Sequence, residues 1–522
     1  MPLTGSVSPI LDYAETQRPR PAVERFFASP WLLLPLILAV AFAVRWYQLG
    51  HESLWLDEFL AMQNATGRGE RHMTLAHDAV LDPAPHLTSS GDGPGFWKIW
   101  TSLGTDSHPP LYFMALNLWR RAFGDGDVAA RYLSVAFSLV AIVLLYDVAR
   151  LLHGSRAVGL WAALLMALAG AQITYAQEAR NYTMLLALTL AACDALVRIE
   201  KRGAGTWRAA ALCASLLAMM LTHYLAFPAV GALGLYALLR LRGPALRATF
   251  AAFAVAVVIF AACWGPFLLE QRAGIPGELY ASREEPSGNL VRGLRRLVIL
   301  PLRYFTEPMK ASRWVGQASV VLYVLPLILL PRRRDLLLWC LLGGATIFGV
   351  FASDLLRSAH GLAYLRYTFL ASAPAYALAA AMLWHMKGFF RHLVPLVLSV
   401  ACVAAIEEPY STSKADTREL AQFIRTRATP DDVVIVCTQA EPDWQARALY
   451  LGLAHYAPPP CPVVFLSGPP DAELASRIRA AKSIWMMSPA AAVPNEDVLP
   501  GSEMLEASFF PWVGTVERVR WP

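Results

Sequence analysis

Long apolar runs alternate with short polar connections over most of this chain. The runs lie near residues 31–49, 131–152, 156–175, 181–199, 207–222, 225–241, 247–270, 313–331, 335–352, 363–385 and 388–405. About 20 apolar helical residues cross a hydrocarbon core of roughly 30 Å. The pattern therefore predicts an all-α polytopic membrane protein with about eleven transmembrane helices. A shorter amphipathic run, 109–123, is expected to lie along the membrane surface as an interfacial helix.

The basic residues predict the orientation of these helices. Arginine and lysine gather in short connections near 198–208, 240–247, 332–334 and 387–391, which the positive-inside rule assigns to the cytoplasm. Residues 1–30 are then a cytoplasmic N-terminus and 31–405 a transmembrane domain. The loops 50–130 and 271–312 lie outside. The letters AFA near residue 42 also resemble a signal-peptide cleavage site, but the long apolar run favours an uncleaved first helix.

The composition changes near residue 406, where charge and proline increase. The stretch TRELAQFIRTRATPDDVVIVCTQ predicts a helix, a turn and a buried strand, and CPVVFLSG and SIWMMSP predict further strands. Residues 406–522 are therefore expected to form a small α/β domain outside the membrane, without a nucleotide or metal motif. Its two cysteines, Cys437 and Cys461, could pair as a disulfide or stay reduced.

Composition narrows the class of protein further. The chain of 522 residues is 56% hydrophobic and 16% charged, with a mean hydropathy of +0.42 and a net charge of +6. Because the basic residues sit in membrane loops, we expect lipid phosphates and not nucleic acid as partners. The seven cysteines show no metal-binding spacing, so no cofactor is expected, although a divalent metal is not excluded.

The stretch HESLWLDEFLAMQ places two acids, Asp57 and Glu58, directly after the first apolar run. Neighbours on a helix point about 100° apart, so one acid can face a cavity while a basic partner holds the other. Apolar surroundings raise the pKa of a carboxyl group and make the carboxylate a better base. The alternative is a pair of solvated acids in a loop.

Other candidate residues share the outer side of the membrane in this topology. The cations expected to hold a donor phosphate or lipid are Lys98, His108, Arg131, Arg180, Arg295, Arg296 and Arg366. The residues expected to line a sugar or acceptor pocket are Trp55, Tyr112, Glu178, His223, Tyr224, His360 and Tyr367. A lone histidine or tyrosine at an interface is usually an anchor. Acids, cations and aromatic rings together suit a lipid-linked sugar phosphate.

Five stretches in order, SLWLDEFLAM, SHPPLYFMALNLW, YAQEARNY, LTHYLAF and LRYTFLASAPAYAL, resemble the GT-C superfamily of integral-membrane glycosyltransferases. The likeness is closest to the dolichyl-phosphate-mannose protein mannosyltransferases and the lipid A aminoarabinose transferases. It implies an inverting transfer from a polyprenyl-phosphate sugar to a hydroxyl of a glycan, lipid or protein. It also implies a bacterial inner-membrane protein whose active site faces the periplasm.

The resemblance also implies roles for single residues. Asp57 matches the catalytic acid and would be the general base, and Glu58 would orient a substrate or the surroundings of Asp57. Arg131 matches an arginine at the start of the second span. His108 stands where aminoarabinose transferases have a phosphate-contacting lysine, although the mannosyltransferases share its His-Pro-Pro. Residues 271–312 take the place of a loop that closes over the lipid carrier.

Two other functions stay open at this point. One is a transporter or flippase for a lipid-linked sugar, which should show internal repeats and ionisable residues on broken helices at the membrane midplane; the sequence shows neither. The other is a glycan polymerase or ligase that uses a polyprenyl-diphosphate donor. The identity of the sugar and of the acceptor, and the oligomeric state, follow from no motif.

Overall fold

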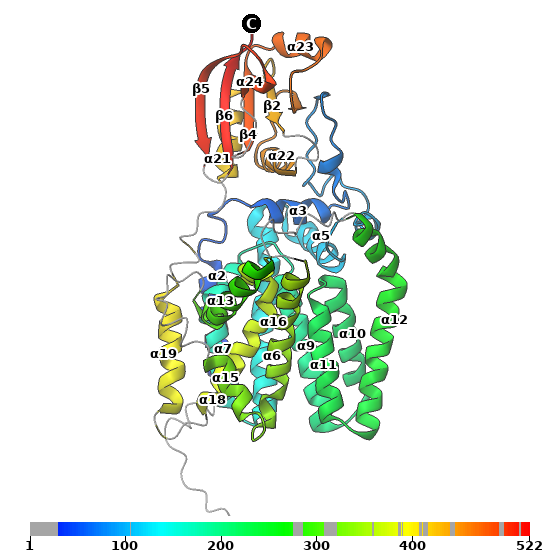
Figure 1. Cartoon of the computed structure of the whole chain (residues 1–522), viewed down its shortest axis with the longest axis vertical. Coiled ribbons are helices and arrows are strands. Elements are labelled where there is room, and N and C mark those ends of the chain that lie inside the picture. Colours follow the sequence, from blue (N-terminus) through cyan, green and yellow to red (C-terminus); the bar gives the residue numbers. More distant parts are fainter. Residues whose placement is uncertain are drawn as a thin grey trace, which may run out of the picture.

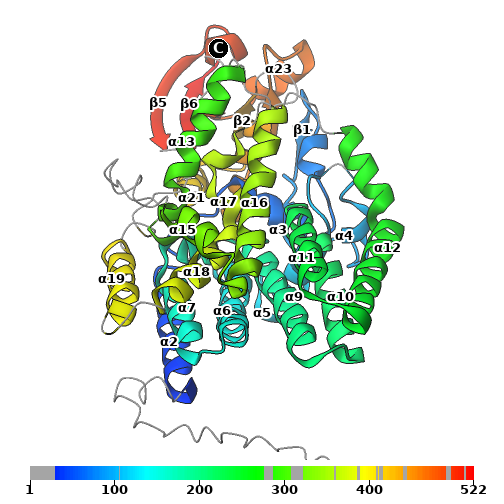
Figure 2. The ribbon, with the colours of Figure 1, turned by 60° about the horizontal axis from the view of Figure 1, so that its bottom comes forward.

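The chain folds into a helical bundle that carries a small sheet at one end (Figure 1). The computed structural model describes residues 30–104, 106–274, 286–306, 321–357, 360–384, 388, 390–406, 410, 416–438, 444–489, 495–510 and 513–522. The predictions for residues 1–29 and for parts of the loop 271–312 lie outside the described residues. Figure 2 shows the molecule tilted so that the end of the bundle away from the sheet comes forward.

Helices occupy most of the described residues in each predicted apolar run. The helices of the bundle are α2 (Pro30–Trp46), α6 (Asp127–His153), α7 (Arg156–Leu168), α8 (Gly170–Ala176), α9 (Tyr182–Arg202), α10 (Thr206–Thr222), α11 (Ala226–Arg240), α12 (Gly243–Gly274), α13 (Pro286–Phe305), α15 (Val321–Leu329), α16 (Leu337–Arg357), α18 (Ser372–Trp384) and α19 (Phe390–Ala404). Among the described residues, α6, α9, α12 and α16 are long and apolar enough to cross a membrane, and the bent pair α7–α8 adds a fifth candidate. The chain is a multi-pass membrane protein, and the number of eleven spans stays a prediction.

Short helices cover the end of the bundle that faces the sheet. They are α3 (Leu56–Asn64), η1 (Arg71–Thr74), α4 (Lys98–Thr101), α5 (Leu111–Phe123), η4 (Gly361–Ala363), α17 (Leu365–Thr368) and η5 (Phe369–Ala371). In Figure 1, α3 lies across the top of the upright helices, close to α5. One side of α5 buries Phe113 and Leu116 while Leu118 stays exposed. This division fits the amphipathic helix predicted for 109–123.

The sheet has six strands in the order β1-β3-β2-β4-β6-β5. Their bounds are β1 (Val80–Leu81), β2 (Val433–Cys437), β3 (Val463–Leu466), β4 (Ile484–Pro489), β5 (Glu503–Phe510) and β6 (Gly514–Arg520). The central strands β3, β2 and β4 are parallel and buried along their whole length, as parallel strands covered on both faces are. The first strand, β1, comes from the loop 50–130 and pairs antiparallel with β3.

The helices that cover the sheet are α21 (Thr417–Arg427), α22 (Trp444–Tyr456), α23 (Ala472–Arg479) and α24 (Asn495–Val498). Side chains of α21 and α22 share one apolar core with the bundle, whereas α23 and α24 pack on a second, smaller core. Cys437 and Cys461 are both buried free thiols, so the structure shows the second of the two predicted alternatives.

A buried arginine holds the break between α7 and α8. The two helices meet at Ala169 with a bend of 61°, which leaves carbonyls at the end of α7 without partners in their own helix. Arg45 of α2, which is fully buried, donates to the carbonyls of Ala167 at 2.8 Å and Met166 at 3.1 Å, and to Ser138 Oγ at 2.8 Å. This contact fixes the direction in which α8 leaves the bundle.

Replacing Arg45 with leucine should destabilise the bundle, because the carbonyls of Met166 and Ala167 lose their donor. Each buried acceptor left without a partner costs about 1–3 kcal/mol. We therefore expect a lower melting temperature for the detergent-solubilised variant, measured by tryptophan fluorescence. Arg121→Leu, on the exposed side of α5, is the matched control, and equal melting temperatures for the two variants would contradict the role of Arg45.

Candidate active site

The two adjacent acids occupy the first turn of α3. The positive end of a helix dipole favours acidic side chains in this turn. Glu58 Oε2 also accepts a hydrogen bond from the backbone N–H of Trp55 at 3.3 Å, which closes the start of the helix. The carboxylates point in different directions, because Glu58 is fully buried while the Asp57 side chain is 22% exposed.

Glu58 is held by Arg131 of α6. The Nε and Nη2 atoms of Arg131 donate to Oε1 and Oε2 of Glu58, both at 2.8 Å. Oε1 also accepts a hydrogen bond from the backbone N–H of Ala179 at 2.8 Å. One buried carboxylate thus joins α3, α6 and the link between α8 and α9. Two parallel charge-assisted bonds fix the orientation of the Glu58 carboxylate relative to the Arg131 guanidinium as well as the distance between them.

Arg131 has no donor left for a ligand. Its Nη1 and Nη2 atoms also donate to the backbone carbonyls of Leu49, Glu52 and Ser53 at 2.9, 2.9 and 3.0 Å. A guanidinium carries five N–H donors, and these bonds together with those to Glu58 use all five. Arg131 is 1% exposed. In this structure Arg131 therefore holds Glu58 and the chain before α3, and the predicted contact of Arg131 with a donor phosphate stays a prediction.

Asp57 faces two other arginines. Its Oδ2 atom accepts a hydrogen bond from Nη1 of Arg366 at 3.1 Å and lies 3.7 Å from Nη2 of Arg180. Nη1 of Arg180 also donates to the backbone carbonyl of Asp57 at 3.0 Å. The fold therefore places one partly exposed carboxylate beside cations from α17 and from the α8–α9 link.

Aromatic rings surround the guanidinium of Arg366. Its Cζ atom lies 4.9 Å from the ring centroid of Tyr364, 5.2 Å from that of Tyr367 and 5.5 Å from that of Trp55. Each such contact contributes about 0.5–2 kcal/mol. The rings restrict the orientation of the guanidinium. Trp55 and Tyr367 were predicted to line a sugar or acceptor pocket; the structure places both beside Arg366, and that role stays a prediction.

A pair of histidines lies beside Arg180. His108 Nδ1 is 3.2 Å from Oδ1 of the buried Asp106, and His108 Nε2 is 3.5 Å from Nη2 of Arg180. The ring of His223 is 5.0 Å from that of His108, nearly perpendicular to it. Nδ1 of His223 accepts from the backbone N–H of Leu225 at 3.0 Å. Burial lowers the pKa of His223 well below its usual value, and the neighbouring cations act in the same direction. His223 is therefore neutral at physiological pH.

Three buried N–H groups around Asp57 have no acceptor within the described part of the chain: Nε of Arg180, Nε of Arg366 and Nε1 of Trp55. Arg180 is only 6% exposed. A buried donor without a partner is unusual in a folded protein and calls for an explanation. A ligand rich in acceptor oxygens, such as a phosphate, would satisfy these donors. The described residues contain no group of three histidine, cysteine or acidic side chains that could hold a metal ion.

The other predicted residues make no described contact with Asp57. Tyr112 and Glu178 are buried. The Tyr224 hydroxyl accepts from the indole N–H of Trp264 at 2.9 Å and bonds to Gln271, so it ties the α10–α11 turn to α12. No described contact connects the remaining four with Asp57. They are Lys98 on α4, Arg295 and Arg296 on α13, and His360 before η4. Their predicted roles stay predictions.

Three further residues lie at the site: Asp106, which the sequence did not single out, and Tyr182 and Tyr364, which lie in the expected outer-interface stretches but had no assigned role. Asp106 Oδ1 accepts from the backbone N–H of His108 at 2.7 Å, a local turn that aspartate commonly makes two residues ahead. Tyr182 lies under Arg180, with 5.7 Å from Cζ to the ring centroid. Each of the three stands two positions from a predicted residue. For Asp106 the Asp-x-His spacing of this local turn is a signal that could have identified the residue, whereas no pattern marks the two tyrosines as ring partners of an arginine.

Sequence comparison gives one partial match. Residues 107–268 match the model of a family described as dolichyl-phosphate-mannose-protein mannosyltransferase. This segment is less than half of the chain and contains His108, Arg180 and His223. No curated protein matches the chain.

Several solved structures have a similar fold. The oligosaccharyltransferase of Archaeoglobus fulgidus, in complex with Zn and sulfate, aligns with a TM-score of 0.50 and 12% identity over 87% of this chain and 68% of that chain. ArnT from Cupriavidus metallidurans in the apo state gives a TM-score of 0.47 and 13% identity over 94% of this chain and 98% of that chain. The resemblance to the GT-C superfamily that the motifs indicated is confirmed. At this identity the structures show the fold and leave donor and acceptor open.

Glu58→Gln should destabilise the protein strongly, because the buried guanidinium of Arg131 loses its counter-charge. Removing one partner of a buried ion pair costs about 3–5 kcal/mol. We expect a much lower melting temperature in detergent than for Asp57→Asn, which changes the neighbouring, partly exposed acid. If the two variants melt at the same temperature, Glu58 does not have this structural role.

Proposed function

We propose that this chain is a glycosyltransferase that moves a monosaccharide from a polyprenyl-phosphate donor to an acceptor hydroxyl, with Asp57 as the general base. The observation that carries the proposal is the Asp57 carboxylate at 3.1 Å from Arg366 and 3.7 Å from Arg180. The description of the matching family, which names dolichyl-phosphate-mannose, supports the class of donor.

In the proposed reaction a single displacement inverts the anomeric carbon. Asp57 takes the proton of the acceptor hydroxyl as its oxygen forms a bond to that carbon. The bond from the same carbon to the phosphate oxygen breaks, and the phosphate leaves with the electron pair. Glu58 is fully buried, so Asp57 is the one of the two adjacent acids that substrate can reach. A single accessible carboxylate suits a direct displacement.

The arginines would stabilise the charge that develops on the leaving phosphate. Arg180 and Arg366 each have a buried Nε–H without an acceptor. Preorganised donors of this kind, in a site shielded from water, stabilise a developing anion without having to reorganise. The planar guanidinium also matches two phosphate oxygens at once. His108, at 3.5 Å from Arg180, lies where it can become a further ligand of the same phosphate.

An apolar groove between α11 and α16 suits the lipid chain of such a donor. It holds about 470 Å³, and Pro228, Gly231, Leu235, Leu341, Gly344 and Phe348 are among the residues that line it. Small residues on both helices make room for a chain to lie between them. The helix α11 begins three residues after His223, and Pro228 in its first turn lines the groove. The phosphate would sit at its upper end and the prenyl units along it.

The polar site would face the outer side of the membrane, which in a bacterium is the periplasmic side of the inner membrane. The helix α9 begins at Tyr182, beside Arg180, and ends at Lys201 and Arg202. The basic connections thus lie at the end of the bundle away from Asp57. The positive-inside rule assigns that end to the cytoplasm. Lipid-linked sugars are then the donors within reach of the site.

Asp57→Asn should abolish sugar transfer without unfolding the protein, because the amide cannot accept the proton. Loss of a general base lowers turnover by about 10²–10⁴-fold. The assay uses the purified protein in lipid nanodiscs with a panel of polyprenyl-phosphate monosaccharides and a membrane extract as acceptor. Release of free polyprenyl phosphate is followed by mass spectrometry.

Release with one donor that disappears in Asp57→Asn would identify both the reaction and the sugar. Full release by the variant would rule out Asp57 as the base. No release by the wild-type protein with any monophosphate donor would favour a diphosphate-linked donor or lipid transport instead.

Arg366→Lys should weaken donor binding although it keeps the charge. Lysine loses the planar donors and the stacking on Trp55, Tyr364 and Tyr367. We expect the KM for the donor to rise about tenfold, a loss of about 1.4 kcal/mol, in the same nanodisc assay. Arg332→Lys changes an exposed arginine in a predicted cytoplasmic connection and is the control. A donor KM equal to that of the control would contradict this role.

A further inference from the structure

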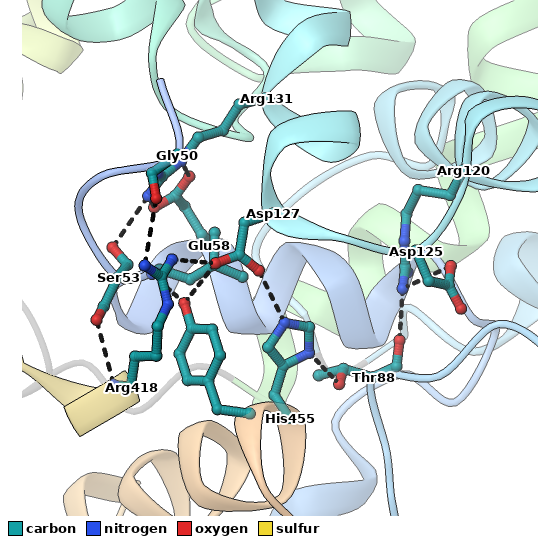
Figure 3. Close-up of polar contacts among 12 residues, drawn as sticks. Gly50, Ser53, Glu58, Thr88, Arg120, Asp125, Asp127, Arg131, Arg418 and His455 are labelled. Carbon is teal, nitrogen blue, oxygen red and sulfur yellow. Dashed lines mark hydrogen bonds and ion pairs between the residues drawn. The ribbon is translucent and has the colours of Figure 1, made fainter. Parts of the chain in front are cut away.

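The domain that carries the C-terminal sheet rests directly on the helix of the two acids. Figure 3 shows Arg418 from α21 and His455 from α22 converging on Asp127, the first residue of α6, next to Glu58 and Arg131. Two predicted domains therefore meet at the candidate active site. The contacts between them are polar and specific.

Asp127 binds three side chains of the C-terminal domain. Its Oδ2 atom accepts from Nη2 of Arg418 and from the hydroxyl of Tyr456, both at 2.8 Å. Its Oδ1 atom accepts from Nε2 of His455 at 3.0 Å. The other ring nitrogen of His455 lies 2.8 Å from the hydroxyl of Thr88. The Asp127 side chain is 11% exposed, so water competes little for these bonds.

The same domain binds the backbone that leads into α3. The Tyr456 hydroxyl, which donates to Asp127, accepts from the backbone N–H of Leu54 at 2.5 Å. Nη1 of Arg418 donates to the carbonyls of Gly50 and His51, both at 3.2 Å. Leu54 is three residues before Asp57. The path of the chain into the first turn of α3 therefore depends on groups more than 350 positions later.

An apolar contact supports the polar ones. The ring of Phe59 on α3 packs edge-on against the rings of His455 and Tyr456, with centroids 5.6 and 5.8 Å apart. Gly452 of α22 allows this approach, because a Cβ atom there would meet the ring of Phe59 and the methyl group of Thr417. The two helices are thus packed as closely as their backbones permit.

These contacts hold α3 from two sides. Arg131 holds Glu58 from the bundle, and α22 holds Phe59 from above. Asp127 and Arg131 lie one turn apart on α6. The residue that holds α3 from the bundle therefore lies on this helix, and the α22 residues that contact α3 from above are bonded to the same helix. Asp57 directly precedes Glu58 and Phe59 in the chain, so these contacts fix the backbone position from which its carboxylate extends.

We infer that Asp127 and Tyr456 are positioning residues, through which the C-terminal domain sets the place of the Asp57 carboxylate relative to the substrate. The inference rests on the proposed function of Asp57. A small misplacement of a reacting group lowers turnover by one to two orders of magnitude. No described contact joins Asp127 or Tyr456 to Arg180 or Arg366. Arg180 and Arg366 are carried by the α8–α9 link and by α17, and their described contacts with the start of α3 are those with Asp57 and with the ring of Trp55. Loss of either positioning residue should therefore affect kcat more than the donor KM.

A second tie between the domain and the same loop is independent of Asp127. Strand β1 pairs with β3. Nη1 of Arg447 donates to the carbonyls of His72 and Leu75 at 2.8 and 2.9 Å. The Tyr450 hydroxyl donates to the carbonyl of Pro85 at 2.7 Å. These bonds should keep the domain in place in point variants of the Asp127 cluster. Such variants then test positioning and not loss of the domain.

The test compares Asp127→Asn and Tyr456→Phe with the wild type and with Glu503→Gln, in the full chain in nanodiscs. Glu503 pairs loosely with Arg520 at 3.9 Å on the far strand of the sheet, where both are exposed. The turnover number kcat is calculated per donor-binding site, because a smaller folded fraction would otherwise lower the apparent kcat. Amide hydrogen exchange over residues 50–64 is measured on the same samples.

We expect kcat to fall about tenfold or more in both variants, with the donor KM within about twofold of wild type and faster exchange over 50–64. Asp127→Glu, which keeps the carboxylate, should recover part of the turnover, and Glu503→Gln should behave as wild type. Unchanged kcat per binding site, or a loss confined to KM, would overturn the inference. If the wild type transfers no sugar, the proposed function fails, and the exchange data alone decide whether the domain holds α3.

Discussion

The buried ion pair between Glu58 and Arg131 is the constraint on which the site depends. It joins α3, α6, the α8–α9 link and the chain from Leu49 to Ser53 through bonds that use every donor of one guanidinium. A buried charge pair is seldom a net source of stability. Its value here is geometric, because only one arrangement of four segments satisfies all the bonds at once.

The adjacent acids consequently have opposite environments. Glu58 is enclosed and matched, whereas Asp57 remains partly exposed beside two arginines with unused donors. In the proposed reaction the donor phosphate and Asp57 share the same guanidinium groups. Under that proposal, a bound phosphate would compete with Asp57 for these groups, so that donor binding would also free the carboxylate for a hydroxyl.

Local patterns in the sequence predicted much of this arrangement. The apolar runs located the helices, and the spacing of Asp57 and Glu58 on a helix implied that they face different partners. The partner of Arg131 could not be predicted, because an arginine at a helix start can bind a phosphate or a buried acid equally well. The pairing of β1 with β3 could not be predicted either. A strand of two residues has no periodicity of its own, and its partner lies nearly 400 positions later. Lys98, Arg295 and Arg296 were selected by charge alone, and charge does not specify which ligand or surface a side chain meets, so their roles stay predictions.

The pairing of β1 with β3 has a consequence for how the protein is made. The loop that carries Asp57 emerges early in synthesis, but its strand partner and the tyrosine that binds Leu54 emerge only after more than 450 residues. The membrane helices can be inserted long before that point. A nascent or prematurely terminated chain therefore has a bundle without a finished site. The residues that fix the start of α3 are thus complete only after the membrane helices have been made.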